Sequence, residues 1–169
     1  MTSEYQAGTS LGFTSLLCTT PEDIKRCMAI RFAVFVDEQG YSPDVEVDEK
    51  DSTSDHLLLI SSSGHDIGTV RLYPPLVKLG RLAVSSSTRG TGAGKVMMQV
   101  LEEHVQSGRG RMGEWIREKK GMGEVRVQAN VQKHAEGFYG KCGYEVEGEE
   151  FLEEGQPHVK MTKVIKVDV

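Results

Sequence analysis

A glycine-rich turn is the segment of this chain whose residue types and spacing are best suited to chemistry. It consists of Arg89, Gly90, Thr91, Gly92, Ala93, Gly94 and Lys95. A predicted strand over residues 77–84 precedes it, and a predicted amphipathic helix follows. The backbone N–H groups that open a helix lack partners within it, the helix dipole is positive there, and glycines let an anion approach closely. The turn is therefore suited to hold an anion such as a pyrophosphate.

Two common phosphate-binding motifs do not fit this turn. A Walker loop needs a glycine where this chain has Arg89, and Ser or Thr where it has Val96. A dinucleotide-binding turn needs a third glycine, which is missing in either possible frame. The frame Arg/Gln-x-x-Gly-x-Gly/Ala does fit, because Arg89, Gly92 and Gly94 meet it. A strand-to-helix turn that binds no ligand is the alternative.

The elements predicted around the turn include both strands and helices. Thr20 and Pro21 are typical of a helix cap and a first helical position, and this helix is expected to fade near Asp37. Helices are also predicted over residues 113–119 and 134–141. Strands are predicted over residues 11–17, 56–60, 67–73, 77–84, 124–129, 144–151 and 159–167. This order implies a mixed α/β fold, in which helices cover the faces of one sheet.

The rest of the chain is assigned to connections around a single domain. Its 169 residues suit one domain over residues 11–169, preceded by a flexible tail over residues 1–10. Residues 38–55 form an acidic loop that is predicted to be too polar for a core element. Residues 106–123 are glycine-rich and basic, and we interpret them as an insertion that either covers a binding site or forms a mobile surface loop.

A second pattern lies near the C-terminus and makes a family resemblance explicit. It consists of Gln132, Ala135, Tyr139, Gly143 and Tyr144. With the glycine turn, it resembles the GNAT superfamily of N-acetyltransferases, whose second motif is Asn-x-x-Ala-x-x-x-Tyr-x-x-x-Gly-[Phe/Tyr]. The chain departs from that motif at its first position, where Gln132 replaces Asn, although Asn130 lies two residues earlier. The segments 34–39 and 154–158, with Met161, are similar to the ElaA-like branch, so the resemblance spans residues 31–161.

The resemblance implies a fold and a bound cosubstrate. The GNAT fold is a single mixed, mostly antiparallel sheet with helices on both faces and a splayed central strand pair. Members bind acetyl-coenzyme A along the splayed strand and at the turn. The implied cofactor-binding residues are Leu82, Ala83, Val84, Arg89, Gly90, Thr91, Gly92, Ala93, Gly94, Lys95, Asn130, Gln132 and Tyr139. The implied activity is transfer of the acetyl group to a primary amine of a small molecule or peptide by direct attack, or else a non-catalytic acyl-coenzyme A sensor.

Several residues are candidates for the chemistry of that transfer. Tyr139 resembles the family's general acid, which would protonate the departing thiolate; a packed core tyrosine is the alternative. Glu38, after the first helix, is the first candidate for the base that deprotonates the amine, and Glu46 and Asp48 are alternatives. Each of these carboxylates could equally be a solvated loop residue, and together they could attract a cationic acceptor. His158 is expected to line the acceptor pocket, to act as a base, or only to cap a strand end.

Composition limits the other classes of function. The net charge of −5 argues against a protein that grips nucleic-acid phosphates. Cys18, Cys27 and Cys142 form no CxxC pair, and the histidines lack the spacing of metal ligands, so neither a disulfide framework nor a metal site is expected. The first residues do not resemble a signal peptide, and no apolar run is long enough for a bilayer. We therefore expect a cytoplasmic protein that is a monomer or homodimer, with no nucleic-acid or membrane partner.

Overall fold

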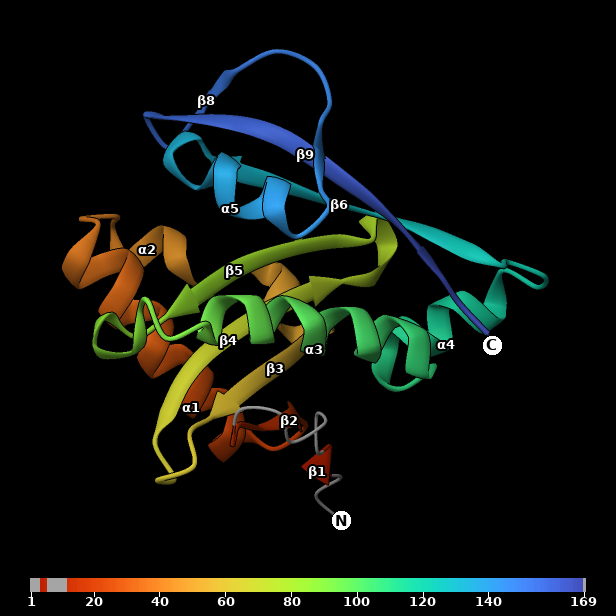
Figure 1. Ribbon diagram of the computed structural model, residues 1–169, viewed down its shortest axis with the longest axis horizontal. Coiled ribbons are helices and arrows are strands. Elements are labelled where there is room, and N and C mark those ends of the chain that lie inside the picture. The colour runs from red at the N-terminus through yellow and green to blue at the C-terminus, as the bar shows by residue number, and fades with distance from the viewer. Residues whose placement is uncertain (1–3, 6–11, 169) are drawn as a thin grey trace.

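The computed structural model describes residues 4–5 and 12–168, which form one twisted sheet with helices on both faces (Figure 1). The strand order is β1-β2-β3-β4-β5-β6-β9-β7, and β8 pairs with β9. Neighbouring strands are antiparallel except β5 and β6, which are parallel. The predicted fold class, a single mixed and mostly antiparallel sheet, is confirmed.

The first five strands form the N-terminal half of the sheet. They are β1 (Glu4–Tyr5), β2 (Thr14–Cys18), β3 (Asp55–Ile60), β4 (Asp66–Tyr73) and β5 (Lys78–Val84). Residues 1–10 were expected to form a flexible tail, but residues 4–5 pair with β2, and the other residues of that segment lie outside the described ones. The strand predicted over residues 11–17 begins only at Thr14.

Strands β5 and β6 (Glu124–Gln132) meet at one point and then part. Within the described residues they pair only where Lys78 lies opposite Gln128. A β-bulge shifts the register between β4 and β5, and Arg81 lies within it at a φ of 52°. Because a bulge increases the local twist of a strand, it helps to turn the end of β5 away from β6. The predicted splayed strand pair is confirmed.

The C-terminal half of the sheet is built on β9 (Gln156–Lys166), which is antiparallel to the whole of β6. The other edge of β9 pairs with β7 (Glu145–Val146) and β8 (Phe151–Glu153). The single strand predicted over residues 144–151 is wrong in its middle, because the chain bends at Gly148 with a φ of 83°.

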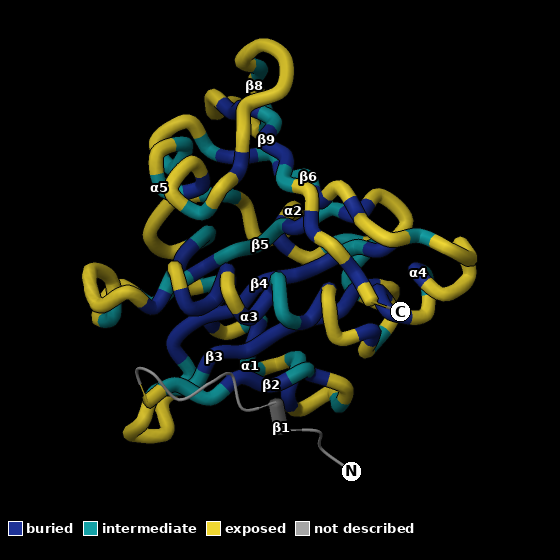
Figure 2. Tube along the Cα trace, turned by 45° about the vertical axis from the view of Figure 1, so that its right-hand side comes forward, coloured by how far each residue is buried: buried dark blue, intermediate teal, exposed yellow. Residues whose placement is uncertain are grey.

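Each face of the sheet has its own apolar core. Helices α3 (Ala93–Ser107), α4 (Gly110–Glu118) and α5 (Glu136–Lys141) cover one face, where Met97 and Leu101 are fully buried. Helix α1 (Pro21–Arg31) covers the other face with Cys27 and Ile30 against Leu58. The central strands are accordingly buried along most of their length (Figure 2). No helix of the described chain is both long and apolar enough to span a membrane.

Helix α1 begins as predicted and continues into a wider helix. The Thr20 hydroxyl accepts a hydrogen bond from the Asp23 backbone N–H at 3.2 Å, and Pro21 is the first helical residue. After α1 the chain forms a π-helix over Phe32–Glu38, which ends close to the expected position. Such wide turns are frequent at functional sites.

The prediction that residues 38–55 are too polar for the core is wrong. They contain the short helix α2 (Pro43–Glu46) and a 3₁₀ turn over Glu49–Thr53. The Glu46 side chain is almost fully buried, because the Arg31 guanidinium, itself 1% exposed, pairs with it. A charge can be buried when an opposite charge and hydrogen bonds compensate it.

Residues 106–123 are not a surface loop throughout. Nine of them fold into α4, whose Met112 and Ile116 are buried in the larger core. The Asp55 carboxylate accepts hydrogen bonds from the backbone N–H groups of Arg111 and Met112 at the start of this helix. The predicted short helix exists, but it begins at Gly110 rather than at residue 113.

Candidate functional site

The glycine turn leads from β5 into the N-terminus of α3. It reverses the chain at Gly90 and Gly92, whose φ angles of 81° and 87° are those that glycine adopts without steric cost. No side chain caps the 15-residue helix α3, so its first backbone N–H groups can serve a ligand. At Gly94 a Cβ atom would lie 3.2 Å from the Phe138 ring, so glycine lets α5 approach closely. The predicted anion site therefore has the backbone geometry that it requires.

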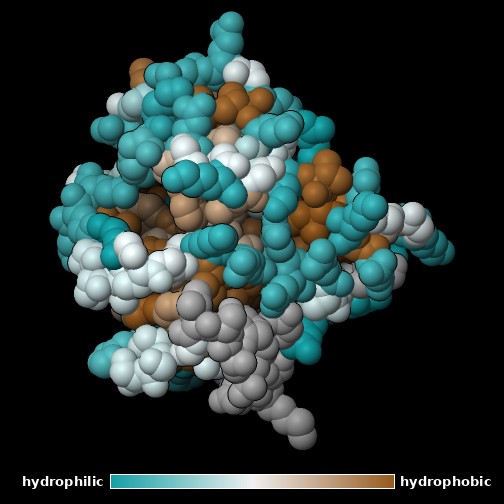
Figure 3. Space-filling model, in the orientation of Figure 1, coloured by the Kyte–Doolittle hydropathy of each residue, from teal (hydrophilic) through white to brown (hydrophobic). Residues whose placement is uncertain are grey.

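The end of β5 leaves backbone groups open on the side of β6. Ala83 and Val84 pair with β4 on one edge only, because β6 has already diverged. Figure 3 shows a hollow with apolar walls between α5 and the loop that leads into α3, where these two strands part. Leu82 and Val84 are half-buried against the larger core. An extended ligand in this hollow could pair with the free edge of β5.

Arg89, the first residue of the glycine turn, forms an ion pair with Glu38. The Arg89 Nη1 lies 2.7 Å from Glu38 Oε2, and the Nε and Nη2 groups of Arg89 donate to the Val84 carbonyl. The first candidate base therefore lies beside the anion site, where its carboxylate is held by the arginine of the motif.

Tyr139 is buried in α5 between two other aromatic rings. Phe138 and Tyr144 each contact it edge-on with ring centroids 5.6 Å away. Burial raises the pKa of the Tyr139 phenol well above its usual value. Its hydroxyl has no hydrogen-bond partner within the described residues. The phenol is therefore protonated at neutral pH and can donate a hydrogen bond to a ligand.

The two candidate amides have partners in different parts of the chain. The Gln132 amide donates to Gln39 Oε1 at 2.7 Å and to the Tyr41 hydroxyl at 3.2 Å. The Asn130 amide donates to Glu153 Oε1 at 2.9 Å. Both side chains are therefore engaged with other protein groups.

Glu46 and Asp48 belong to a buried network of ion pairs. Its members are Arg31, Arg71, Arg81, Glu46, Asp48 and Asp51. Arg31 Nε lies 2.7 Å from Glu46 Oε1, and Arg71 Nη1 lies 2.6 Å from Asp48 Oδ1. Burial alone would raise the pKa of Asp48, but the hydrogen bonds from Arg71 outweigh it and the net shift is downward. We therefore do not retain these two carboxylates as candidate bases, because guanidinium groups occupy their oxygens.

His158 lies opposite Gln132 on β9 and is held on both ring nitrogens. Its Nδ1 lies 2.8 Å from the Gln156 carbonyl oxygen, and its Nε2 lies 3.5 Å from Glu153 Oε2. The Phe151 ring stacks on it, with centroids 6.0 Å apart. His158 is almost fully buried, whereas the Glu153 side chain is 43% exposed. Of the two, Glu153 is the group that solvent or a ligand can reach.

Comparison with known proteins identifies the family to which the chain belongs. The family described as an acetyltransferase (GNAT) domain matches residues 21–165, which is most of the chain. This chain belongs to the GNAT family. It is therefore an acyltransferase by membership, and the match includes the glycine turn.

Several GNAT relatives resemble the chain over nearly its full length. The uncharacterized protein YyaT of Bacillus subtilis is 32% identical over 155 residues, which cover 89% of this chain and 95% of YyaT. A solved acyl-CoA N-acyltransferase from Pseudomonas aeruginosa has a TM-score of 0.69 at 26% identity, covering 90% of this chain and 99% of that one. The structure of Escherichia coli ElaA shares the fold, with a TM-score of 0.66 and 24% identity. The match covers 89% of this chain and 97% of ElaA.

Two charged residues near the splayed strands, Glu153 and Lys78, are not among the sequence-based candidates. Glu153 joins Asn130 and His158 only through the pairing of β6, β8 and β9, so no local motif marks it. Lys78 lies where β5 and β6 part, and its partner across the strands is 50 positions further along the chain. Alternation along the predicted strand 77–84 could have placed Lys78 on a face, but not opposite β6.

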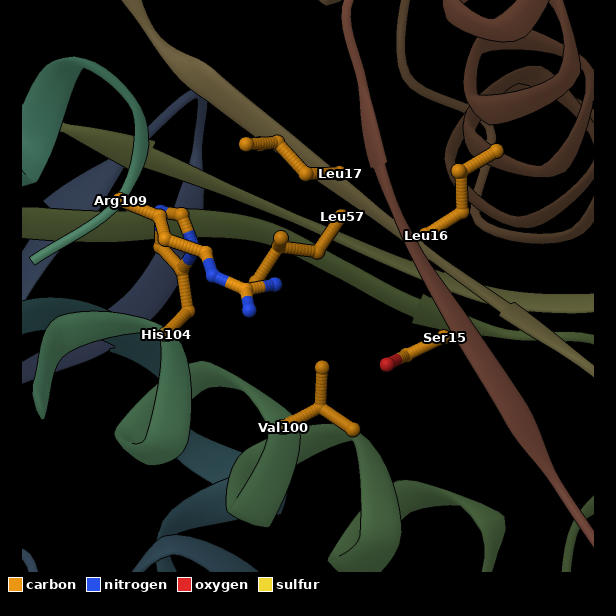
Figure 4. Close-up of a pocket in the computed structure, with 7 residues that line it drawn as sticks. All are labelled: Ser15, Leu16, Leu17, Leu57, Val100, His104 and Arg109. Atoms are coloured by element: carbon orange, nitrogen blue, oxygen red, sulfur yellow. The ribbon is translucent and has the colours of Figure 1, made fainter. Parts of the chain in front are cut away.

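A small pocket lies away from the GNAT site. It is formed by Ser15, Leu16, Leu17, Leu57, Val100, His104 and Arg109, and it holds about 10 Å³. Figure 4 shows that mostly aliphatic side chains of β2, β3 and α3 surround it. This volume holds roughly one water molecule, so we assign no ligand to it.

The described residues contain neither a disulfide nor a cluster of potential metal ligands. Cys18, Cys27 and Cys142 are free, and the buried Cys18 and Cys27 sulfur atoms lie 3.4 Å apart. Residues 4–5 and 12–168 contain no group of three or more His, Cys, Asp or Glu side chains that could hold a metal ion.

Proposed function

We propose that this GNAT protein transfers the acetyl group of acetyl-coenzyme A to a primary amine of a small molecule or peptide by direct attack. The observation that carries the proposal is the uncapped N-terminus of α3, which follows two left-handed glycines at the end of the splayed strand. The backbone N–H groups would hold the pyrophosphate, and the free edge of β5 would pair with the amide groups of the pantetheine arm.

The chain's own groups support direct transfer. The amine nitrogen attacks the thioester carbon, the carbon–sulfur bond breaks, and the thiolate departs. The buried phenol of Tyr139 is protonated, so it can donate a hydrogen bond to the departing sulfur atom. No side chain has to form a covalent acetyl intermediate in this sequence of steps.

Calorimetry tests the cosubstrate assignment directly. Acetyl-coenzyme A should bind with a dissociation constant in roughly the micromolar range, whereas ATP and NADH should not bind. The variant Gly92→Ala strains the turn and should weaken binding at least tenfold (~1.4 kcal/mol). Gly64→Ala is a matched control, because Gly64 also has a positive φ, of 85°, but lies in the β3–β4 hairpin.

The outcomes of that titration are distinct. Binding followed by thiol release with an amine would support the acetyltransferase assignment. If folded protein does not bind acetyl-coenzyme A, the glycine turn has only a structural role and the proposal is wrong. Binding without thiol release from any amine would favour an acyl-coenzyme A sensor instead.

A further inference from the structure

Lys78 is a half-buried cation with no partner among the described residues. It is the first residue of β5 and lies opposite both Tyr73 and Gln128, at the point where β5 and β6 part. No hydrogen bond or ion pair to its ammonium group is formed within the described chain. Burial lowers the pKa of the Lys78 ammonium, and the field of the Glu153 carboxylate opposes that shift.

The other charges near Lys78 leave it uncompensated. The three arginines of the ion-pair network already face three carboxylates, namely Glu46, Asp48 and Asp51. Lys50, whose ammonium lies 5.6 Å from the centre of the Tyr73 ring, adds a further cation. Lys50 and the nearby arginines Arg71 and Arg81 lower the pKa of Lys78 further. An anion from a ligand would therefore be attracted to this place.

Lys78 faces the side of the sheet that carries residues 38–55. Its cross-strand neighbour Tyr73 is covered on that side by Lys50. On β6, positions 128, 130 and 132 share one face because side chains alternate along a strand. Gln132 contacts Gln39 and Tyr41 from this face. Lys78 and Asn130 therefore lie on the same wall of the splayed strands.

Glu153 supplies a negative charge on the same wall. The Asn130 amide binds one of its oxygens at 2.9 Å, and His158 Nε2 lies 3.5 Å from the other. No ion pair joins Glu153 to Lys78, although the carboxylate acts on the pKa of the lysine. A cation and an anion are thus held apart beside the point where the strands separate.

The position of Lys78 separates it from the pyrophosphate site. The glycine turn follows the last residue of β5, and Lys78 is the first. Six residue steps along a strand correspond to about 20 Å. The anion that Lys78 would attract is therefore not the pyrophosphate that we place at the glycine turn, and the acceptor is the remaining reactant.

We propose that Lys78 and Glu153 bind the two charged ends of the acceptor, which is an amino acid or a similar amine that carries a carboxylate. This inference rests on the proposed function and names the substrate class of the same site. Lys78 binds the acceptor carboxylate, and Glu153 binds its ammonium group. Glu153 then accepts one ammonium proton, the nitrogen–carbon bond forms as the carbon–sulfur bond breaks, Tyr139 gives its phenol proton to the thiolate, and the proton shed by the new amide nitrogen restores the phenol.

Matched acceptors test the substrate class. Each of the common amino acids is compared with its own carboxamide, because the pair differs in the carboxylate alone. Thiol release from acetyl-coenzyme A gives kcat/KM for both members. For at least one side-chain type, we expect kcat/KM for the amino acid to exceed that for its carboxamide roughly 10- to 100-fold. This is the effect of losing one hydrogen bond to a charged group.

Two variants test the roles proposed for Lys78 and Glu153. Lys78→Met should remove the preference by lowering kcat/KM for the acid alone, whereas the exposed Lys166→Met serves as the matched control. Glu153→Gln should lower kcat for acids and amides alike. In both variants calorimetry should give the wild-type affinity for acetyl-coenzyme A, which shows that the fold and the cosubstrate site are intact.

The possible failures are distinguishable. Carboxamides that react as well as the acids would overturn this inference, as would a Lys78→Met variant whose kcat/KM falls equally for acids and carboxamides. Either result would leave the proposed acetyltransferase function standing. Absence of turnover, together with absence of a thermal shift by any amino acid on the coenzyme A-bound protein, would also overturn it. Failure of the wild type to bind acetyl-coenzyme A would instead refute the proposed function, and this inference with it.

Discussion

Tyr139 and Tyr144 have the same functional group in different surroundings. Both rings are buried in contact with each other, and burial raises the pKa of both phenols. The Tyr144 hydroxyl is enclosed without a hydrogen-bond partner in the described chain, so no ligand can reach it. The family resemblance places the general acid at Tyr139, and we infer that, of the two tyrosines, only Tyr139 serves the reaction.

Replacing each tyrosine by phenylalanine tests that distinction. Tyr139→Phe should lower kcat roughly 100-fold, the contribution of one general acid, and leave the dissociation constant of acetyl-coenzyme A within about twofold. Tyr144→Phe should keep full activity and should not lower the free energy of unfolding, because it removes an unsatisfied buried hydroxyl. Steady-state kinetics and urea unfolding measure both effects. Equal loss of activity in the two variants would contradict the assignment of Tyr139.

The ion pair between Glu38 and Arg89 leads to a second prediction. The Glu38 carboxylate competes with an incoming phosphate for the Arg89 guanidinium, and it also repels that phosphate. Glu38→Gln should therefore tighten acetyl-coenzyme A binding about two- to fivefold, since exposed pairs contribute at most about 1 kcal/mol. Calorimetry measures this, with the exposed Asp37→Asn as a control of equal charge change. Weaker binding by Glu38→Gln would show that Glu38 instead orients Arg89 for the cosubstrate.

Among the elements, the segment from the π-helix to the 3₁₀ turn depends most on tertiary contacts. Val34 of the π-helix is buried, but Val45 and Val47 after it are exposed, and the segment meets β6 through contacts of Gln39 and Tyr41 with Gln132. Arg31 holds it in place through Glu46 and Asp51, which lie in α2 and the 3₁₀ turn. The part of the segment after the π-helix is therefore fixed by buried charges rather than by aliphatic packing.

Removing one charge from this network should be costly. Glu46→Gln leaves the buried Arg31 guanidinium with too little compensation, so the free energy of unfolding should fall by about 3–5 kcal/mol. The exposed Asp44→Asn, two positions earlier in the same helix, should change it by less than about 0.5 kcal/mol. Urea unfolding followed by circular dichroism compares the two variants. Equal stability of both would mean that the network does not hold the segment.

For the whole molecule, the network predicts sensitivity to acid. Burial raises the pKa of Asp51, but hydrogen bonds from Arg31, the Asp48 backbone N–H and Arg71 outweigh it and bring the pKa to about 2. Because this folded-state pKa is depressed, the stabilisation is complete above the unfolded value near 3.9 and is lost as the pH falls toward 2. Asp51 alone should account for about 2 kcal/mol of that loss.

Unfolding free energies measured between pH 7 and pH 2.5 check this expectation. The wild type should lose stability steeply below about pH 4, and Asp51→Asn should be less stable at pH 7 with a shallower slope. Asp44→Asn should follow the wild-type slope. Parallel curves for the wild type and Asp51→Asn would exclude Asp51 as a source of the acid sensitivity.

The sequence by itself determined the features that depend on neighbours along the chain. The Thr20 cap, the glycine turn before α3 and the positions of β3, β4 and β5 follow from residue types at short spacing. Helix periodicity and left-handed glycines depend on neighbouring residues, so they can be predicted without knowledge of the fold. The motif residues Arg89, Gly92 and Tyr139 were recognisable for the same reason.

Only the tertiary structure decided which charges are free. Glu46 and Asp48 looked like loop carboxylates, but arginines far away in the sequence occupy them. The role that we propose for Lys78 and Glu153 depends on contacts across the sheet. Lys78 lies opposite Gln128, 50 positions away, and Glu153 binds Asn130, over 20 positions away. A charge can be buried only with a partner, and that partner is set by contacts across the sheet. The partners of these charges therefore could not be predicted from the sequence.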